Sequence, residues 1–440
     1  MSVLSRGVRT KEVKVAVVGL GYVGTPVAAL FADVGFDVLG VDINEDKIRK
    51  ISQGINPIGG KEPGLSDLLK RAVGRGRLRT TSDYRELSDR DIILISVETP
   101  VDDKTKMPRY VALRAAVGDI GEHMKRGSMI IIESTIAPQT MESVVLPLLE
   151  ARSGFRVNED FYLVHCPERV MPGKLLHNLR NCDRVVGVSC DQAGECAQEF
   201  YSHVVCGNLD VTDLLTAEVV KTAENAYRDV QIAFANELAM VCRELGADFW
   251  KVRELINKSP HRDVHQAGAG VGGHCIPKDS WLLISPLKKR EDLKIIPHAR
   301  HINDFMPFHV VALLEEGLSE AGKELTGAAV AVLGYSYLPN SDDTRNAPSI
   351  VLIEELKSLG VDVRVHDPYV EEYRSDLENV VRDADATVVM VAHDDYCTLD
   401  WREVTDLMAG RVFVDGRNVL GREKALELNL IYKAVGVGDN

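Results

Sequence analysis

The chain has 440 residues, of which 45% are hydrophobic and 27% charged, and its formal net charge is -14. This balance is typical of a folded protein of two or three domains and excludes a disordered chain. The acidic charge argues against a nucleic-acid partner, because nucleic-acid binders need a basic surface that displaces counterions.

The cysteines and the N-terminus point away from metal and membrane. There are eight cysteines, with no CxxC pair and no His/Cys cluster of zinc spacing. The N-terminal segment MSVLSRGVRTKEVK has no apolar signal core, and no run of ~18 apolar residues occurs. We therefore expect no metal, no membrane partner, free thiols and a cytoplasmic location.

The first part of the chain alternates strands with helices. Residues 13–18 predict a buried strand, followed by a glycine-rich turn and a helix to about residue 32. Further strands are expected at 37–41, 91–97, 128–132 and 161–164. This alternation predicts a parallel sheet with both faces covered.

The turn after the first strand predicts a dinucleotide site. Gly19, Gly21 and Gly24 form GLGYVG between a strand and a helix, where they permit a tight turn, close approach of a pyrophosphate and close helix packing. Asp42 ends the second strand, where a carboxylate binds an adenosine ribose and repels a 2′-phosphate. The pattern favours NAD over NADP, against the alternative of a tight turn without a ligand.

Residues 210–256 predict a long helix or helix pair with a stop at Gly246. Lys221, Asn225 and Arg228 follow each other at i, i+4 and i+7, so they share one face. The nearby acids are Glu218 and Glu224. The face is therefore a candidate anion site, and a solvated polar stripe is an equal alternative.

The segment GAGVGGHCIPKD holds four glycines in six residues, a backbone that a ligand can approach closely. Cys275 follows this loop and is a candidate nucleophile if positive charge from Lys278 or His274 favours its thiolate. A buried, inert cysteine is the common alternative, and it is the interpretation kept for the other seven.

Residues 328–440 repeat the alternating pattern, with a strand and turn at AAVAVLGYSY, a helix near 348–359, and strands at VDVRVHD, ATVVMVAHD and RVFVDGR. The turn near Gly334 lacks the three-glycine pattern, so a different ligand or none is expected there. The predicted fold class is α/β, with two Rossmann-like parallel-sheet domains joined by a central helical segment.

These segments together resemble the UDP-glucose/UDP-mannuronate dehydrogenase family over nearly the whole chain. The matching pieces, in the family's order, are VAVVGLGYVGTPVA, SVETP, ESTIAP, CPERVMPG, the KxxxNAYR helix, GVGGHCIPKD, SDDTRNAPS and VDGRN. Val271 and His274 stand where the UDP-glucose enzymes have Phe and Ser. With these two residues, the segment GVGGHC resembles that of the UDP-N-acetyl-D-mannosamine 6-dehydrogenase branch.

The resemblance implies a four-electron, NAD-dependent oxidation of the C6 hydroxyl of a UDP-sugar to a uronate for polysaccharide biosynthesis, through a cysteine thioester. It also implies a homodimer of chains with three domains, namely 1–208 for NAD, 209–322 for dimerisation and the cysteine loop, and 323–440 for the UDP-sugar. The catalytic positions implied are Cys275, Lys221, Asn225, Asp279 and Glu168. Those implied for NAD are Gly19, Gly21, Tyr22, Val23, Gly24, Asp42, Lys47, Thr99, Thr135 and Arg345. Those implied for the substrate are Glu168, Arg169, Val170, Lys221, Asn225, Arg228, His261, Arg262, Gly272 and Arg417.

The chain departs from the family pattern at three places. Leu338 and Pro339 stand where a substrate-contacting Lys is frequent, Lys47 stands where an Arg is frequent, and SPHRDV replaces the HPR-type segment around His261. A UDP-glucose or UDP-N-acetylglucosamine 6-dehydrogenase therefore stays open. A two-electron dehydrogenase of the hydroxyacid type and a non-catalytic NAD-sensing protein are alternatives from other classes.

Overall fold

An eight-stranded sheet forms from the short apolar runs of the first half of the chain. Its order is β3-β2-β1-β4-β5-β6-β7-β8, and all pairs are parallel except β6 with β7. This is the Rossmann order extended by two strands. The strands are β1 (Lys14–Val18), β2 (Asp37–Val41), β3 (Leu78–Thr81), β4 (Ile92–Ile95), β5 (Met129–Ile132), β6 (Tyr162–His165), β7 (Arg184–Val188) and β8 (Leu209–Asp213).

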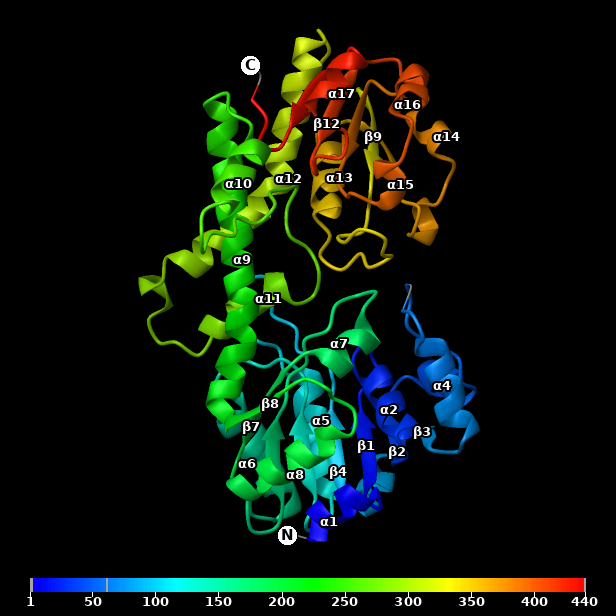
Figure 1. Cartoon of the computed structure of the whole chain (residues 1–440), viewed down its shortest axis with the longest axis vertical. Coiled ribbons are helices and arrows are strands. Elements are labelled where there is room, and N and C mark those ends of the chain that lie inside the picture. Colours follow the sequence, from blue (N-terminus) through cyan, green and yellow to red (C-terminus); the bar gives the residue numbers. More distant parts are fainter. Residues whose placement is uncertain (1–2, 61, 439–440) are drawn as a thin grey trace. The chain divides into compact units, whose positions relative to one another are not determined.

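Side chains of the central strands alternate between two apolar cores. In β1, Val15 and Val17 pack into one core and Ala16 and Val18 into the other, as a period of two requires. Figure 1 shows α2 and α4 side by side, with α2 next to β2. The helices of this part are α1 (Val3–Thr10), α2 (Gly24–Asp33), α3 (Glu45–Ser52), α4 (Leu65–Gly74), η1 (Tyr84–Asp89), α5 (Val111–His123), η2 (Met141–Val145), α6 (Leu146–Ser153), α7 (Leu175–Asn181) and α8 (Asp191–Ser202).

The predicted long helical segment is two helices. Helix α9 runs unbroken over Leu214–Glu244, and α10 follows at Phe249–Asn257 (Figure 1). Gly246 between them has φ +73°, a left-handed conformation that ends a helix at low cost. The segment 210–213 belongs to β8 and not to the helix, because it pairs with β7.

A second, five-stranded parallel sheet has the order β10-β9-β11-β12-β13. Its strands are β9 (Ala329–Leu333), β10 (Asp362–His366), β11 (Ala386–Val389), β12 (Val412–Asp415) and β13 (Ile431–Ala434). The remaining helices are α11 (Ile276–Ile284), η3 (Arg290–Asp292), α12 (Ile295–Glu320), α13 (Pro348–Ser358), η4 (Glu371–Tyr373), α14 (Leu377–Val381), α15 (Asp394–Cys397), α16 (Trp401–Leu407) and α17 (Arg422–Glu427). The predicted α/β class with two Rossmann-like sheets is confirmed.

The computed structural model describes residues 3–60 and 62–438. It divides into a first unit, Met1–Glu224 with Trp281–Arg290, and a second unit, Asn225–Ser280 with Glu291–Asn440. Helices α9 and α11 contribute residues to both units. The domain boundaries expected near 208 and 322 stay predictions. None of the described helices is long and apolar enough to cross a membrane.

Candidate active site

The turn after β1 has the geometry that a dinucleotide needs. A Cβ on Gly24 would lie 1.8 Å from the carbonyl oxygen of Gly19, and one on Gly19 would lie 2.7 Å from the oxygen of Ser96. These two glycines are therefore required by packing. A Cβ on Gly21, in contrast, would meet nothing within 4 Å. The open side at Gly21 leaves room for a pyrophosphate at the start of α2, directly after Val23.

Asp42 lies directly after β2 and is buried. Its two carboxylate oxygens accept the backbone N–H groups of Leu20 at 2.7 Å and Asn44 at 2.8 Å. Each oxygen keeps a further lone pair for a ribose hydroxyl. The ammonium of Lys47 lies 3.6 Å from the same carboxylate. The residues present therefore fit an NAD molecule bound along this edge.

The other residues of the first unit that are expected to bind NAD also lie in segments that follow its strands. The hydroxyl of Thr99 donates to the carbonyl of Thr135 at 2.6 Å, which joins the segments after β4 and β5. The Tyr22 hydroxyl binds Glu62, and Glu62 also accepts the N–H of Gly173 at 2.7 Å. The structure thus ties the glycine turn to the segment that follows Glu168.

The CPERVMPG segment leaves the sheet after β6. Glu168 is buried, whereas Val170 is partly exposed. The guanidinium of Arg169 pairs with both oxygens of Glu224 on α9.

Glu218 accepts two backbone N–H groups, and burial raises its pKa to about 7. Both acids expected near Lys221 are therefore engaged with other partners.

Helix α9 carries the polar face that the sequence predicted. Lys221 is buried, and its charge contributes to lowering the pKa of His165, after the larger effect of burial. One turn further on, Asn225 donates to the Asp279 carboxylate at 2.6 Å. Arg228 is exposed. Along α9, the buried ammonium of Lys221 is thus followed in the sequence by an amide that donates to a carboxylate.

The cysteine loop, residues 268–275, requires its glycines. Gly270 and Gly273 have φ of +118° and +90°. A Cβ on Gly272 would lie 2.5 Å from the Cβ of Tyr337 and 2.7 Å from the oxygen of Asn346. Cys275 follows at the start of α11 with an exposed thiol. The loop therefore presents the thiol from a tightly packed backbone.

The charge beside this thiol differs from the expectation. Burial, with smaller effects of Lys278 and Arg345, lowers the pKa of His274 to about 4, so its imidazole is neutral near pH 7. Lys278 lies 3.2 Å from Asp279. The Cys275 sulfur is close enough to Arg345 to contribute to the raised pKa of that guanidinium, whose largest cause is its bond with Asp343. Arg345 thus replaces His274 as the neighbouring cation.

Arg417 joins the cysteine loop to the second sheet. Its guanidinium donates to the carbonyl oxygens of Met390 at 2.9 Å and Gly270 at 3.0 Å, and burial lowers its pKa to about 10. His261 and Arg262 are both exposed, and Arg262 donates to carbonyls of its own turn. The structure therefore places Arg417 against the cysteine loop. The hydrogen bonds of Arg262 stay within the turn that carries it and His261.

Sequence reasoning missed a buried network beneath the loop. The Asp229 carboxylate accepts from Arg300 at 2.6 Å, from Asn303 at 2.7 Å and from Ser280 at 3.1 Å. These bonds join α9, α12 and α11, in which Ser280 directly follows Asp279. Isolated polar residues on three distant segments give no local pattern, so only their apolar helical neighbours hinted at their burial. In the described ranges, no group of three His, Cys, Asp or Glu side chains could hold a metal ion.

The candidate site residues fall into two sets. The first unit holds the glycine turn with Asp42, the Thr99–Thr135 pair, the segment around Glu168, and Lys221. The second unit holds the Asn225–Asp279 pair, Cys275 and its loop, Arg345 and Arg417. The first set can hold a dinucleotide. The second carries an exposed thiol and, on the same unit, an amide that donates to a carboxylate.

Comparisons with known proteins agree with this geometry. Three sequence models of the UDP-glucose/GDP-mannose dehydrogenase family match the chain: the NAD binding domain at residues 13–205, the central domain at 215–305 and the UDP binding domain at 331–422. UDP-N-acetyl-D-mannosamine dehydrogenase of Pyrococcus horikoshii is 38% identical over 97% of this chain and 100% of its own length.

Solved structures show the same likeness. The structure of UDP-D-ManNAc dehydrogenase from Pyrococcus horikoshii has a TM-score of 0.92, at 38% identity over 97% of this chain and all of that chain. NDP-N-acetyl-D-galactosaminuronic acid dehydrogenase from Methanosarcina mazei has a TM-score of 0.86, at 36% identity over 99% and 98% of the two chains.

The fold and the site define an NAD-dependent nucleotide-sugar dehydrogenase, with a UDP-sugar as its substrate. The chain belongs to the UDP-glucose/GDP-mannose dehydrogenase family. The predicted family and the predicted cofactor, NAD, are thereby confirmed.

Proposed function

We propose that the enzyme oxidises the C6 hydroxyl of a UDP-N-acetylhexosamine to a carboxylate, through a thioester on Cys275. The observation that carries the proposal is the exposed Cys275 thiol at the start of α11, where Asp279 is bonded to Asn225 of α9. Asn225 lies one helical turn after the buried Lys221. The proposed nucleophile thus comes from the residue before α11, and the two proposed oxyanion-stabilising groups come from successive turns of α9.

In the first oxidation, Lys221 and Asn225 stabilise the negative charge that develops on the C6 oxygen. A buried ammonium and a fixed amide donor act strongly on such a charge, because little water screens them. Asp279 holds the Asn225 amide in place through the 2.6 Å bond. NAD, when bound, would accept the hydride that leaves C6, while the hydroxyl proton passes to water. A second NAD would accept the hydride of the second oxidation.

Cys275 is needed because hydride leaves readily only from a tetrahedral carbon that carries a hydroxyl group. The aldehyde carbon is trigonal, and it becomes such a carbon only when a nucleophile adds to it. The thiolate adds to the aldehyde carbon, and the carbonyl oxygen takes a proton to give a thiohemiacetal. Loss of hydride and of that hydroxyl proton gives the thioester. Water then adds, the C–S bond breaks, and the carboxylate leaves while the thiolate returns. Glu168 is the proposed group that positions this water and accepts its proton.

The positive charge of Arg345 supports this role for Cys275. A guanidinium near a thiol favours the thiolate, which is the nucleophilic form. Arg345 also matches an NAD-contacting position, so one side chain would serve the cofactor and the nucleophile. The remaining cofactor positions are those of the glycine turn with Tyr22 and Val23, and Asp42, Lys47, Thr99 and Thr135.

Substrate binding is proposed for residues of both units. They are Glu168, Arg169, Val170, Lys221, Asn225, Arg228, His261, Arg262, Gly272 and Arg417. Arg417 has the strongest support, because its guanidinium contacts the cysteine loop at Gly270 and is carried by the UDP-binding domain match. His261 and Arg262 have the weakest, because both are exposed on a turn after α10.

UDP-N-acetyl-D-mannosamine is the proposed sugar nucleotide. The relative from Pyrococcus horikoshii carries that name, and the one from Methanosarcina mazei is named for an N-acetylgalactosaminuronic acid. Both names contain an N-acetyl group, which agrees with Val271 and His274 in the cysteine loop. UDP-N-acetylglucosamine and UDP-glucose are the alternatives that the test must separate.

A homodimer is proposed through the central helices. Tyr227, Phe234 and Val241 are exposed on α9 at intervals of seven residues, and Phe305 and Phe308 are exposed on α12. Apolar side chains at this spacing form a stripe that a second helix can cover. The product would enter polysaccharide biosynthesis in the cytoplasm, where the eight free cysteines stay reduced.

A panel of UDP-sugars, read by NADH absorbance, tests the proposal. UDP-N-acetylmannosamine should give the highest kcat/KM, ahead of UDP-N-acetylglucosamine and UDP-glucose. A site that hydrogen bonds an N-acetyl group rejects a sugar without it, because its own buried polar groups are left unpaired. The highest kcat/KM for UDP-glucose would contradict the proposed sugar and leave the chemistry at Cys275 intact.

A further inference from the structure

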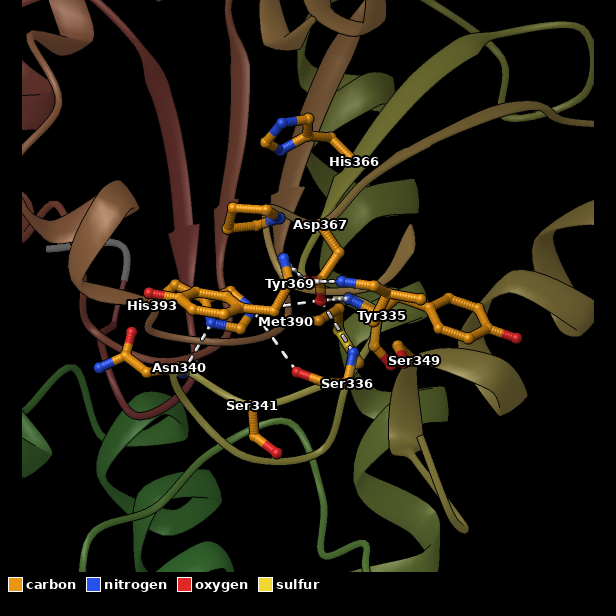
Figure 2. A network of polar contacts seen from close by, with 12 residues as sticks. Tyr335, Ser336, Asn340, Ser341, Ser349, His366, Asp367, Tyr369, Met390 and His393 are labelled. Carbon is orange, nitrogen blue, oxygen red and sulfur yellow. Dashed lines mark hydrogen bonds and ion pairs between the residues drawn. The ribbon is translucent and has the colours of Figure 1, made fainter. Parts of the chain in front are cut away.

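A buried polar cluster lies at the carboxyl ends of β9, β10 and β11 (Figure 2). Its centre is the side-chain pair of Asp367 and His393, both fully buried. The chain passes from β9 to β10 on one side and returns to β11 on the other, and ligands of open α/β sheets bind at such a switch point. The loop 334–347, between β9 and α13, contacts the cluster at this point.

The hydrogen bonds of His393 define its tautomer. Nδ1 accepts the backbone N–H of Asn340 at 2.9 Å, so the ring proton is on Nε2, which donates to Asp367 at 3.1 Å. The Ser336 hydroxyl is 3.5 Å from the same Nε2 and donates to Leu338. In a nucleophilic triad, serine and aspartate bind opposite ring nitrogens. The pair of Asp367 and His393 therefore holds the loop 334–347 in place and is not a second catalytic centre. We call this pair the clamp.

The clamp fixes the loop at its start and at its tip. Asp367 accepts the backbone N–H groups of Tyr335 at 2.7 Å and Ser336 at 3.0 Å, where the loop leaves β9. At the tip, Asn340 has φ +59°. Its side-chain amide donates to the Asp394 carboxylate at 2.8 Å, and its side-chain oxygen accepts the backbone N–H of Asp394 at 3.0 Å. His393 is the group that holds the backbone of this tip.

The far end of the same loop holds the cysteine loop. The N–H of Gly273 donates to the carbonyl of Arg345 at 2.8 Å, and the Asn346 amide donates to the carbonyl of Gly273 at 3.0 Å. The N–H of Tyr337 donates to the carbonyl of Asp343 at 3.1 Å, which closes the loop between tip and far end. No Cβ fits at Gly272 against Tyr337, so the two loops cannot slide past each other without repacking.

We propose that His393 is a positioning residue for the oxidation. By fixing Asn340 it holds the loop 334–347 in one conformation, and that loop holds Gly273, and with it the Cys275 thiol and Arg345, in place. The inference rests on the proposed role of Cys275 as the nucleophile. A fully satisfied buried polar cluster specifies one geometry, and a reacting group displaced by 1 Å costs about 100-fold in rate.

The test compares His393→Asn, His393→Gln and His393→Ala in the full-length enzyme. The Asn side-chain oxygen can replace Nδ1 and accept from Asn340, whereas the Gln amide reaches toward Asp367. We expect kcat to fall about 10- to 100-fold in His393→Ala and His393→Gln. In His393→Asn, kcat should be about tenfold higher than in those two variants. Asp400→Ala, which removes the N-cap of α16 in the same sheet domain, is the control for lost stability.

Two further readouts separate positioning from a purely structural role. Alkylation of Cys275 by iodoacetamide, followed by peptide mass spectrometry, should slow about fivefold in His393→Ala, because Arg345 is no longer fixed beside the thiol. Cys206, exposed in the first unit, is the internal reference. Hydrogen exchange of the Asn340 amide should be slower in His393→Asn than in His393→Gln, and this holds as a test even if His393→Ala does not fold.

Equal kcat, alkylation and exchange in His393→Asn and His393→Gln would overturn the inference, as would losses that match those of Asp400→Ala. Cys275→Ala is measured alongside. If Cys275→Ala still makes uronate, the proposed function fails. If Cys275→Ala is inactive and the His393 variants behave like Asp400→Ala, only the positioning role fails.

Discussion

The glycine turn after β1 allows fold and cofactor binding to be separated within one motif. Gly24→Ala places a Cβ 1.8 Å from the Gly19 oxygen, and real Cβ atoms stay beyond 3.0 Å from such neighbours. The turn must therefore open by more than 1 Å. We expect a destabilisation of about 3 kcal/mol or more, since the obstacle is backbone and not a flexible side chain.

Gly21→Ala should do the reverse. Its Cβ meets nothing within 4 Å, and Gly21 lies outside the left-handed region, so an alanine fits without strain. The folded protein should be equally stable or about 0.4–1 kcal/mol more stable, because the unfolded chain loses entropy. The methyl group would occupy the side from which the pyrophosphate approaches. NAD should bind at least about tenfold more weakly, which is about 1.4 kcal/mol.

Gly118→Ala in α5 is the matched control, because its Cβ also meets nothing within 4 Å. Urea unfolding measures the stability of the three variants, and isothermal titration calorimetry measures their affinity for NAD. Gly118→Ala should bind NAD as the wild type does. Wild-type affinity for NAD in Gly21→Ala, or wild-type stability in Gly24→Ala, would refute the assignment of this turn.

Cys275→Ala should fold and bind NAD but form no uronate, whereas Cys397→Ala should keep full activity; the reverse result would mean that the wrong cysteine is assigned. The kcat/KM for NAD should be far higher than that for NADP. Asp42→Ser should lower the ratio of these two values about tenfold or more. The substitution removes the carboxylate that lies 3.6 Å from the Lys47 ammonium, so that Lys47 can bind a 2′-phosphate. An unchanged ratio of kcat/KM values would show that Asp42 does not bind the ribose. Burial lowers the pKa of His165 to about 4, below the value of 6.5 in the unfolded chain. The neutral His165 therefore contributes fully to the free energy of unfolding above pH 6.5. This contribution is lost as pH falls toward 4, by up to about 1.4 kcal/mol per pH unit. The urea midpoint of His165→Gln should therefore fall less steeply between pH 6.5 and 5 than that of the wild type, and parallel curves would contradict this.

The sequence predicted the central strands because their burial gives continuous apolar runs. β4 and β5 are buried at every position, and both were expected close to their observed bounds. Edge strands carry no such pattern. β8, at the end of the first sheet, reads LDVTD and has no buried residue, so the sequence pattern does not separate residues 210–213 from the helix that follows. Its pairing with β7 is a tertiary effect that local propensity does not contain.

The candidate site divides in the same way. The glycine turn and the cysteine loop are local motifs, and their geometry follows from the residues that carry them. The bond between Asn225 and Asp279 joins residues 54 positions apart, and that between His393 and Asn340 spans 53. Such contacts depend on which elements the fold brings together. The neutral state of His274 was missed for the same reason, since it follows from burial.

The number of NADH molecules formed per UDP-sugar consumed tests the central claim most directly. The sugar nucleotide is supplied as the limiting reagent with excess NAD, NADH is read by absorbance at completion, and the product is identified by mass spectrometry. The proposed thioester on Cys275 predicts two NADH per UDP-N-acetylmannosamine and a uronate as the only product. One NADH per sugar, with a free aldehyde as the final product, would contradict it.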